Sequence, residues 1–291
     1  MNQPPTSPIP APATPPSPIA PAPARVSLAD LRSYRAAGRK FAMLTAYDYP
    51  TARAAAAAGL PTLLVGDSLG TVVLGYPNTR TVPLDLIITL AEAVRRGAPQ
   101  VFLMGDVPYV AMSGGTNAVV AAARRFRDEA GCDAVKLEAG PEHVELVAAL
   151  RGERIDTCAH LGLRPQSVAA ADGYRAQARD VDAVAALVAQ AQGMVAAGAS
   201  LLLLEAVPPE ASAAVVAAVD VPVIGCGAGP ACDGHVVVTH DLLGLLPGRV
   251  PRFVPVLEHL HERVVAAMRQ WSDDIASGRY PAPEHTYSMR R

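Results

Sequence analysis

Short apolar runs alternate with longer alanine-rich stretches along almost the whole chain. The apolar runs are rich in Val, Leu and Ile, and each gives way to polar or glycine residues, which is typical of buried strands. They lie at 41–46, 62–65, 101–104, 134–137, 154–158, 201–204, 221–224 and, with the weakest pattern, 250–254.

The stretches between these runs predict helices at 51–58, 84–96, 117–130, 142–150, 182–197 and 210–219. Several of them end at a glycine, which is a common helix stop signal, as at Gly59, Gly97, Gly131 and Gly198. Strands that alternate with helices predict an α/β fold with a parallel sheet. Eight such units favour a closed (β/α)8 TIM-type barrel over a doubly wound open sheet.

Both ends of the chain differ from this repeat. The first 24 residues hold ten prolines, and such a segment cannot bury enough apolar surface to offset its ordering entropy. We therefore expect a disordered tail over 1–25 and a single catalytic domain over 26–291. The stretch 258–277 predicts one long C-terminal helix, which packs outside the barrel or against another subunit.

Composition and charge exclude several classes of partner. The 291 residues carry a net charge of −2, which gives no reason to expect nucleic acid or an anionic membrane surface. No apolar run reaches the roughly 18 residues that a membrane helix needs. The cysteines form no CxxC pair and indicate reduced thiols in a cytoplasmic protein rather than a disulfide scaffold or a thiolate zinc site: Cys132, Cys158, Cys226 and Cys232.

Polar groups gather where the predicted strands end. In a (β/α)8 barrel the active site forms at the carboxyl ends of the strands. Six consecutive predicted strands end in ionisable or hydroxyl side chains there: Asp48, Asp67, Ser68, Asp106, Lys136, Glu138, His160 and Glu205. So many strand ends of this kind indicate a functional site.

Three of these carboxylates suggest a metal site. Asp67 and Asp106 each follow an apolar run and a glycine, and they could instead cap helices, although the next segments, 69–83 and 107–116, look like long loops. Glu138 lies two residues after Lys136, so both side chains point to the same side of the strand and could also form a buried ion pair. Three carboxylates without thiolates favour Mg²⁺.

Two further strand ends offer acid–base chemistry. Glu205 follows four leucines, and burial would raise the pKa of a carboxyl toward the value that a general base needs. Its alternative role is to pair with an arginine such as Arg175 or Arg179. His160 could equally be a hydrogen-bonded core histidine or a polar group over a substrate oxygen.

Two loops complete the candidate site. Residues 225–230, GCGAGP, lack the spacing of a dinucleotide fingerprint, so their glycines more simply permit close backbone approach at the barrel mouth. The segment 165–180 is too long for a simple βα loop and is either a lid or a tolerated insertion.

A magnesium ion beside a lysine and a buried glutamate suits a 2-oxo acid. The carboxylate and keto oxygens can chelate the ion, which then stabilises the enolate that forms when a base removes the neighbouring proton. A Schiff base on Lys136 is a rival route. It is the less favoured of the two, because it needs no set of carboxylates and would leave them without a role.

Seven motifs carry a resemblance to a known family. In order they are TAYD at 45–48, VGDS at 65–68, RRGAP at 95–99, VKLE at 135–138, HLGLRPQS at 160–167, GAGPACDG at 227–234 and EH at 284–285. Together they resemble the ketopantoate hydroxymethyltransferases over about 26–287.

This resemblance implies transfer of a hydroxymethyl group from 5,10-methylenetetrahydrofolate to 3-methyl-2-oxobutanoate, giving 2-dehydropantoate for pantothenate and coenzyme A biosynthesis. It implies that Asp67, Asp106 and Glu138 hold Mg²⁺, and that Asp67, Asp106, Ser68 and Lys136 bind the 2-oxo acid. It also implies that Glu205 is the proton acceptor and His160 an active-site histidine. A homo-oligomer, commonly a decamer with C-terminal helices in its contacts, is the implied assembly.

The chain departs from the family pattern in one loop. Residues 169–179 carry Ala169 at a polar position, Asp172 and Ala178 at glycine positions, and Arg175 at a lysine position. Thr239 replaces a bulky residue. The alternative function is a Mg²⁺-dependent lyase or mutase of the phosphoenolpyruvate type, which needs no folate; a non-catalytic barrel is disfavoured by the intact polar set.

Overall fold

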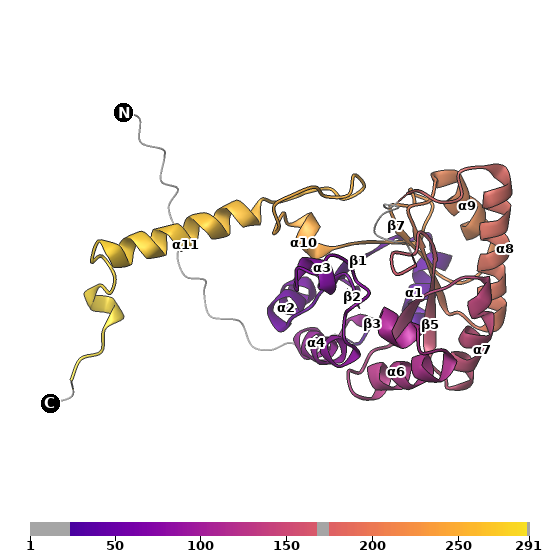
Figure 1. Cartoon of the computed structure of the whole chain (residues 1–291), viewed down its shortest axis with the longest axis horizontal. Coiled ribbons are helices and arrows are strands. Elements are labelled where there is room, and N and C mark those ends of the chain that lie inside the picture. The colour runs from indigo at the N-terminus through magenta and orange to yellow at the C-terminus, as the bar shows by residue number, and fades with distance from the viewer. Residues whose placement is uncertain (1–23, 168–174, 290–291) are drawn as a thin grey trace.

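The computed structural model describes residues 24–167 and 175–289, and its centre is a closed parallel barrel (Figure 1). β8 pairs with β1, matching Phe41 to Gly234 and Met43 to Val236, so the sheet has no free edge. This confirms the predicted (β/α)8 class. The strands are β1 (Phe41–Thr45), β2 (Thr62–Val65), β3 (Phe102–Asp106), β4 (Ala134–Glu138), β5 (Asp156–Gly162), β6 (Leu201–Glu205), β7 (Val223–Cys226) and β8 (Gly234–Val237).

Helices surround the barrel (Figure 1), and the buried side chains form two apolar clusters, one between the strands and the helices and one inside the barrel. Alternate strand residues, such as Leu64, Met104 and Leu203, fill the barrel interior, while their neighbours pack outward against the helices. None of the described helices is long and apolar enough to cross a membrane. The predicted helices are confirmed within three residues at each end as α2 (Tyr49–Ala57), α4 (Leu84–Gly97), α6 (Thr116–Asp128), α7 (Val144–Gly152), α8 (Val181–Ala197) and α9 (Pro209–Ala218).

The prediction for the eighth strand was wrong. β8 is the segment 234–237, not 250–254, and it follows β7 without an intervening helix. Its four residues, GHVV, are too short to stand out as an apolar run. The segment 250–254 begins its turn at Pro251 and is followed by Pro255, and a proline cannot donate to a strand ladder.

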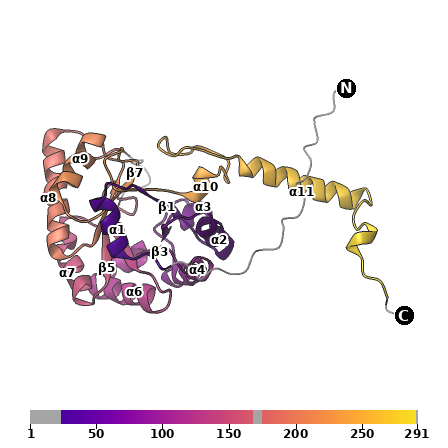
Figure 2. The ribbon, with the colours of Figure 1, turned by 180° about the vertical axis from the view of Figure 1, so that it is seen from behind.

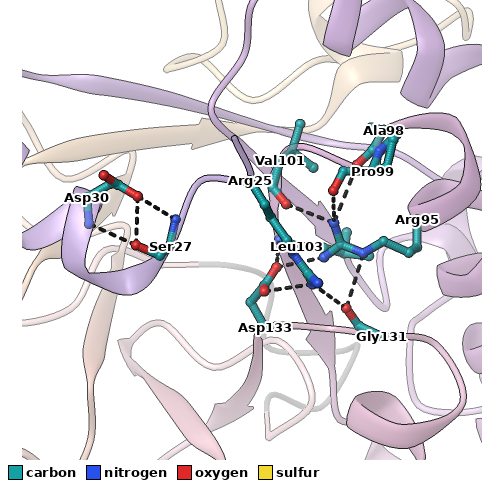
Figure 3. Close-up of polar contacts among 10 residues, drawn as sticks. All are labelled: Arg25, Ser27, Asp30, Arg95, Ala98, Pro99, Val101, Leu103, Gly131 and Asp133. Atoms are coloured by element: carbon teal, nitrogen blue, oxygen red, sulfur yellow. Dashed lines mark hydrogen bonds and ion pairs between the residues drawn. The ribbon is translucent and has the colours of Figure 1, made fainter. Parts of the chain in front are cut away.

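A helix that the sequence pattern did not indicate covers the amino-terminal end of the barrel. α1 (Leu28–Ala36) begins at Ser27, whose hydroxyl accepts from the backbone of Asp30 while the Asp30 carboxylate accepts from the backbone of Ser27. Figure 3 shows this capping box. Leu31 is fully buried and packs with the residues inside the barrel, so α1 closes that end.

An ion-pair cluster joins the segment before α1 to the barrel wall (Figure 3). Asp133, just before β4, binds Arg25 at 2.7 Å and Arg95 at 2.6 Å. Arg95 also donates to the carbonyl of Val101 at 2.9 Å and to that of Gly131 at 3.1 Å. The predicted tail over 1–25 lies outside the described residues except for its last two, and Arg25 is held in this cluster.

The predicted C-terminal helix is confirmed as α11 (Leu260–Ala276), and it extends away from the barrel in both views (Figures 1 and 2). None of its residues is buried. The short elements α3 (Leu69–Val72), α5 (Tyr109–Met112), α10 (Thr239–Leu242), η1 (Pro141–His143) and η2 (Pro283–His285) complete the described chain.

Candidate active site

The barrel brings the predicted site residues together at the carboxyl ends of β2 to β6. Asp106 and Glu138 are the last residues of their strands, and the register pairs Asp106 with Lys136 and Glu138 with His160. Glu205 ends β6, beside the last residue of β5. Four of these side chains are almost fully buried although they are charged or polar: Asp106, Lys136, Glu138 and His160.

The glycines before the two aspartates are needed for close packing. A Cβ at Gly105 would lie 2.3 Å from a ring carbon of Phe126, which packs from α6 against β3. A Cβ at Gly66 would lie 2.9 Å from the Ser68 hydroxyl. The Phe126 ring is fully buried and has no room to move, so glycine at 105 lets β3 stay close-packed against α6. At position 66 a side chain would require the Ser68 hydroxyl to rotate away.

Lys136 is ion-paired with Asp106 rather than with Glu138. Its Nζ lies 2.8 Å from Asp106 Oδ2, and the same oxygen accepts from the backbone of Asp67 at 3.0 Å. Burial acts to lower the pKa of Lys136, but the nearby charges of Asp106 and Asp67 outweigh it and raise that pKa above its ordinary value. A protonated amine cannot attack a carbonyl, so this environment disfavours the Schiff-base route.

Neither aspartate caps a helix. Asp106 Oδ2 contacts the Lys136 ammonium and the backbone N–H of Asp67. The N-cap residue of the short helix α3 is Ser68 rather than Asp67, and no side chain caps that helix. The segments 69–83 and 107–116 were expected to be loops, but each contains a four-residue helix.

Glu138 is held by the segment that follows β5. Its Oε1 accepts from the backbone of Gln166 at 2.8 Å, and its Oε2 lies 3.4 Å from the Ser167 hydroxyl. Burial raises the pKa of Glu138, and the backbone N–H of Gln166 and the charge of Lys136 oppose that rise. The carboxyl group therefore depends on nearby donors and positive charge to remain ionised.

His160 lies between Lys136 and Glu205. Its Nδ1 is 3.4 Å from the Lys136 ammonium, and its Nε2 is 3.1 Å from Glu205 Oε2, in an alignment that falls short of a hydrogen bond. The Glu205 side chain is 20% exposed, so it reaches the mouth of the barrel. Its partner in the described structure is His160, not Arg175 or Arg179.

Two residues at the site were missed by sequence reasoning. The Tyr47 hydroxyl lies 2.7 Å from Ser68 Oγ, and its ring lies 5.4 Å from the His240 ring, centre to centre. Gln166 Nε2 donates to Asp67 Oδ2 at 2.8 Å. Tyr47 belongs to the TAYD motif and Gln166 to the HLGLRPQS motif. Their place in these motifs was the signal that could have identified them as site residues.

The oxygen set fits a hydrated magnesium ion. Among the described residues, no three His, Cys, Asp or Glu side chains are close enough to hold a metal by themselves. Mg²⁺ usually takes only one or two carboxylates and completes its shell with water and substrate oxygens. Asp106 Oδ1 is buried without a hydrogen-bond partner in the described structure, and such an atom needs a cation or a donor.

The two predicted loops have different outcomes. The close-approach interpretation of 225–230 is confirmed, because a Cβ at Gly229 would lie 2.9 Å from Pro209 and one at Gly227 would lie 2.6 Å from the Phe253 ring. The candidate lid at 165–180 falls partly outside the described residues, which leave out 168–174. The departures at Ala169 and Asp172 lie in that gap.

A cavity of about 540 Å³ opens at the other end of the barrel. Asp156, Ser200 and Val221 line it at the starts of strands, together with Arg32, Arg151 and Arg154. Arg151 lies in the last turn of α7, where a positive charge complements the helix dipole. None of the candidate site residues lines this cavity, so it is separate from the candidate active site.

Comparison with known proteins shows the family of the chain. The family model for ketopantoate hydroxymethyltransferase matches residues 25–283. The 3-methyl-2-oxobutanoate hydroxymethyltransferase of Mycobacterium marinum is 42% identical over 282 residues, which cover 97% of this chain and 95% of that protein. The chain belongs to the ketopantoate hydroxymethyltransferase family. A second relative of that name, from Geobacillus kaustophilus, is 41% identical over 90% of this chain and 94% of its own length.

Solved structures share the fold of this family member at low identity. A phosphoenolpyruvate phosphomutase from Streptomyces platensis subsp. rosaceus has a TM-score of 0.60 and 17% identity over 90% of this chain and 92% of that chain. A 2,3-dimethylmalate lyase, described as a member of the PEP mutase/isocitrate lyase superfamily, has a TM-score of 0.58 and 16% identity, over 88% of this chain and 92% of its own. At this identity the likeness concerns the barrel alone.

Proposed function

We propose that the protein transfers a hydroxymethyl group from 5,10-methylenetetrahydrofolate to 3-methyl-2-oxobutanoate, giving 2-dehydropantoate for pantothenate and coenzyme A biosynthesis. The names of the relatives support this choice of substrate. The observation that carries the proposal is a row of polar groups at the barrel mouth. It runs from the buried Asp106 through the buried Lys136 and His160 to the partly exposed Glu205, with successive contacts of 2.8, 3.4 and 3.1 Å.

The carboxylates and the lysine are suited to bind the 2-oxo acid with Mg²⁺. Asp67, Asp106 and Glu138 would hold the ion together with water and substrate oxygens, and the ion would supply positive charge beside the substrate when bound. The Lys136 ammonium adds a fixed positive charge that can hold the substrate carboxylate. The Ser68 hydroxyl, oriented by Tyr47, is a further donor at the same edge.

Glu205 is suited to remove the proton from C3 of the 2-oxo acid. The C–H electron pair then stays on the substrate and forms the new bond from C3 to the one-carbon unit of the folate. Both carbon–nitrogen bonds of that unit break and water supplies the hydroxyl. The C3 proton and the remaining proton of the water end on the two nitrogens of the released tetrahydrofolate. The Lys136 ammonium can only donate, so His160 Nδ1 accepts and its proton sits on Nε2, which faces Glu205. In this role His160 orients the base.

The assembly and location belong to the same proposal. We expect a homo-oligomer, in keeping with an exposed α11 that carries apolar side chains. A decamer is the assembly that the family resemblance implies. All four cysteines are free thiols, which supports a reducing, cytoplasmic location.

The proposal is tested by proton NMR of 3-methyl-2-oxobutanoate in D₂O with enzyme and Mg²⁺, before and after addition of 5,10-methylenetetrahydrofolate. We expect the C3 proton signal to decay without folate and 2-dehydropantoate to form once folate is added. EDTA should abolish both reactions. The Glu205→Gln variant should lose exchange by about 100-fold or more, as expected for loss of a general base.

A matched control is Glu210→Gln, which makes the same change at an exposed position in the first turn of α9. It should exchange like the unaltered protein. Exchange without product would favour the second candidate, a folate-independent lyase or mutase, for which the fold likeness to the 2,3-dimethylmalate lyase is the supporting observation. Unchanged exchange in Glu205→Gln would remove Glu205 from the mechanism.

A further inference from the structure

Gln166 connects two of the carboxylates at the barrel mouth. Its backbone N–H donates to Glu138 Oε1 at 2.8 Å, and its side-chain Nε2 donates to Asp67 Oδ2 at 2.8 Å. The same Nε2 donates to the carbonyl of Val107 at 3.2 Å. Gln166 is 2% exposed, so these bonds form away from bulk water, where an unpaired amide would be costly.

These contacts span three strands. Asp67 follows β2, Val107 follows β3 and Glu138 ends β4, so one residue fixes the ends of three neighbouring strands relative to one another. Asp67 in turn donates its backbone N–H to Asp106 Oδ2 at 3.0 Å. All three proposed metal ligands therefore belong to one hydrogen-bonded group that includes Gln166.

The neutral amide is the side chain that this place requires. Lys or Arg here would bring a positive charge next to Asp67 and compete with a bound cation. Asp or Glu would add a further negative charge without donating in its ionised form. The amide occupies Oδ2 of Asp67 without adding a charge and leaves Oδ1 for a cation.

We propose that Gln166 is a positioning residue, which holds Asp67 and Glu138 in the orientation that binds the divalent cation. This inference rests on the proposed function, because it assumes that these carboxylates bind the metal. Outer-shell partners of ligating carboxylates commonly contribute about 10–100-fold to metal affinity, so loss of the amide should weaken cation binding measurably even without substrate.

The test measures Mn²⁺ binding to the full-length protein by electron paramagnetic resonance of the free ion, with no substrate or folate present. We expect Gln166→Met, which keeps the length but has no donor, to raise the dissociation constant about ten-fold or more. Gln166→Asn keeps the amide on a shorter arm and should give a smaller rise. Thermal unfolding in EDTA measures any loss of stability separately, because no metal is then bound.

A matched control is Gln190→Met. The Gln190 amide, on α8, donates at 3.0 Å to the carbonyl of Ala139, next to Glu138, but to no carboxylate. This variant should bind Mn²⁺ like the unaltered protein. That result would show that loss of a hydrogen bond at the end of β4 does not by itself weaken cation binding.

The outcomes separate the inference from the proposed function. If the unaltered protein binds Mn²⁺ and Gln166→Met binds it equally well, Gln166 does not position the ligands, while the proposed function stands. If Gln166→Met fails to fold, Gln166→Asn decides, and unchanged affinity there overturns the inference. Absence of Mn²⁺ binding by the unaltered protein overturns both.

Discussion

Two alanines with left-handed backbone angles meet beside Glu205. Ala206, directly after Glu205, has a φ of +49°, and Ala178 has a φ of +52°. The backbone of Gln177 donates to the carbonyl of Ala206 at 2.9 Å, so the two residues lie on hydrogen-bonded segments. Such angles are strained for any residue with a Cβ, and residues of this kind often occur at active sites.

The Ala178→Gly substitution should stabilise the protein, since it restores the glycine that the family phrase leads one to expect at this position. Removal of the strained Cβ should raise the free energy of unfolding by about 0.5–1 kcal/mol, as measured by denaturant titration. The same change at Ala186, exposed within α8, should lower it by about 1 kcal/mol. A fall in stability for Ala178→Gly would show that this residue is not strained.

The four cysteines should resist alkylation in the folded protein. Burial raises the pKa of Cys132 and Cys158 to about 12 and that of Cys232 to about 11, and burial also raises the pKa of Cys226. Because the thiolate is the reactive form, iodoacetamide at about pH 8 should modify few of these sites in intact-mass measurements.

Two controls complete the alkylation experiment. The denatured protein should take up four labels, since unfolding exposes all four cysteines. Ser113→Cys places a thiol at an exposed position and should react in the folded state. Rapid labelling of Cys226 in the folded protein would contradict the prediction.

Much of the polar site, though not its pairings, was predictable at the residue scale. The spacing of Lys136 and Glu138 placed both on one side of β4, and the structure agrees. The ion-pair partner of Lys136 depends on the register between β3 and β4, which brings Asp106 opposite it and which no local pattern encodes. Gln166 escaped notice because a loop amide has no periodic signature.

At the scale of single elements, the RRGAP motif has a structural role. Arg95 lies in the last turn of α4 and donates to the carbonyls of Val101 and Gly131. It also pairs with Asp133, just before β4. Asp133 also accepts from the backbone of Leu103 at 2.8 Å. This cluster joins α4, β3 and β4 at the amino-terminal end of the barrel, so the motif supports the wall and does not contact the active site.

The Asp133→Asn substitution should destabilise the protein by about 2–3 kcal/mol, because charge-assisted bonds are lost and Arg95 keeps a half-buried charge. Denaturant unfolding followed by circular dichroism measures this change. Asp128→Asn is the control, since that carboxylate pairs with Arg127 on the surface and should have no measurable effect. Equal stability of both variants would show that the cluster contributes nothing.

Two elements show where pattern reasoning ends. β8 is only four residues long, and what identifies it is pairing with β1 and β7 rather than its own apolar content. α1 carries Ser27 and Asp30 in a capping box, but a lone Leu31 is its only buried residue. Elements with so little apolar surface are defined by tertiary contacts, which the sequence pattern does not encode.

At the scale of the whole molecule, the repeat of strand and helix was enough to predict the closed barrel. The fold prediction holds although the eighth strand was misplaced, because seven units already indicate a parallel sheet. Only the closing strand was misassigned. The barrel does not account for α11, which extends outside it with no buried residue (Figure 2).

One side of α11 carries large exposed apolar side chains, which is unusual for a solvent-facing helix surface. Val264, Met268, Trp271 and Ile275 recur at intervals of four, three and four residues, so they form one stripe along the helix. Their exposed fractions are 42, 67, 50 and 50%. A contiguous apolar stripe of this kind indicates a protein interface, and a second copy of the chain is the partner that the proposed homo-oligomer supplies.

Substitution of Met268 and Trp271 by lysine should therefore dissociate the assembly. Burial of one such side chain contributes about 1.5–3 kcal/mol, and a buried lysine would add a desolvation cost, so the double variant should lose most of its association. Light scattering during gel filtration measures the mass against the 30.2 kDa of one chain. Ala266→Lys, exposed on the opposite side of α11, should keep the mass of the unaltered protein. An unaltered protein that runs as a monomer would show that the stripe has no such role, and an unchanged mass for the double variant would place the subunit contacts on the barrel instead.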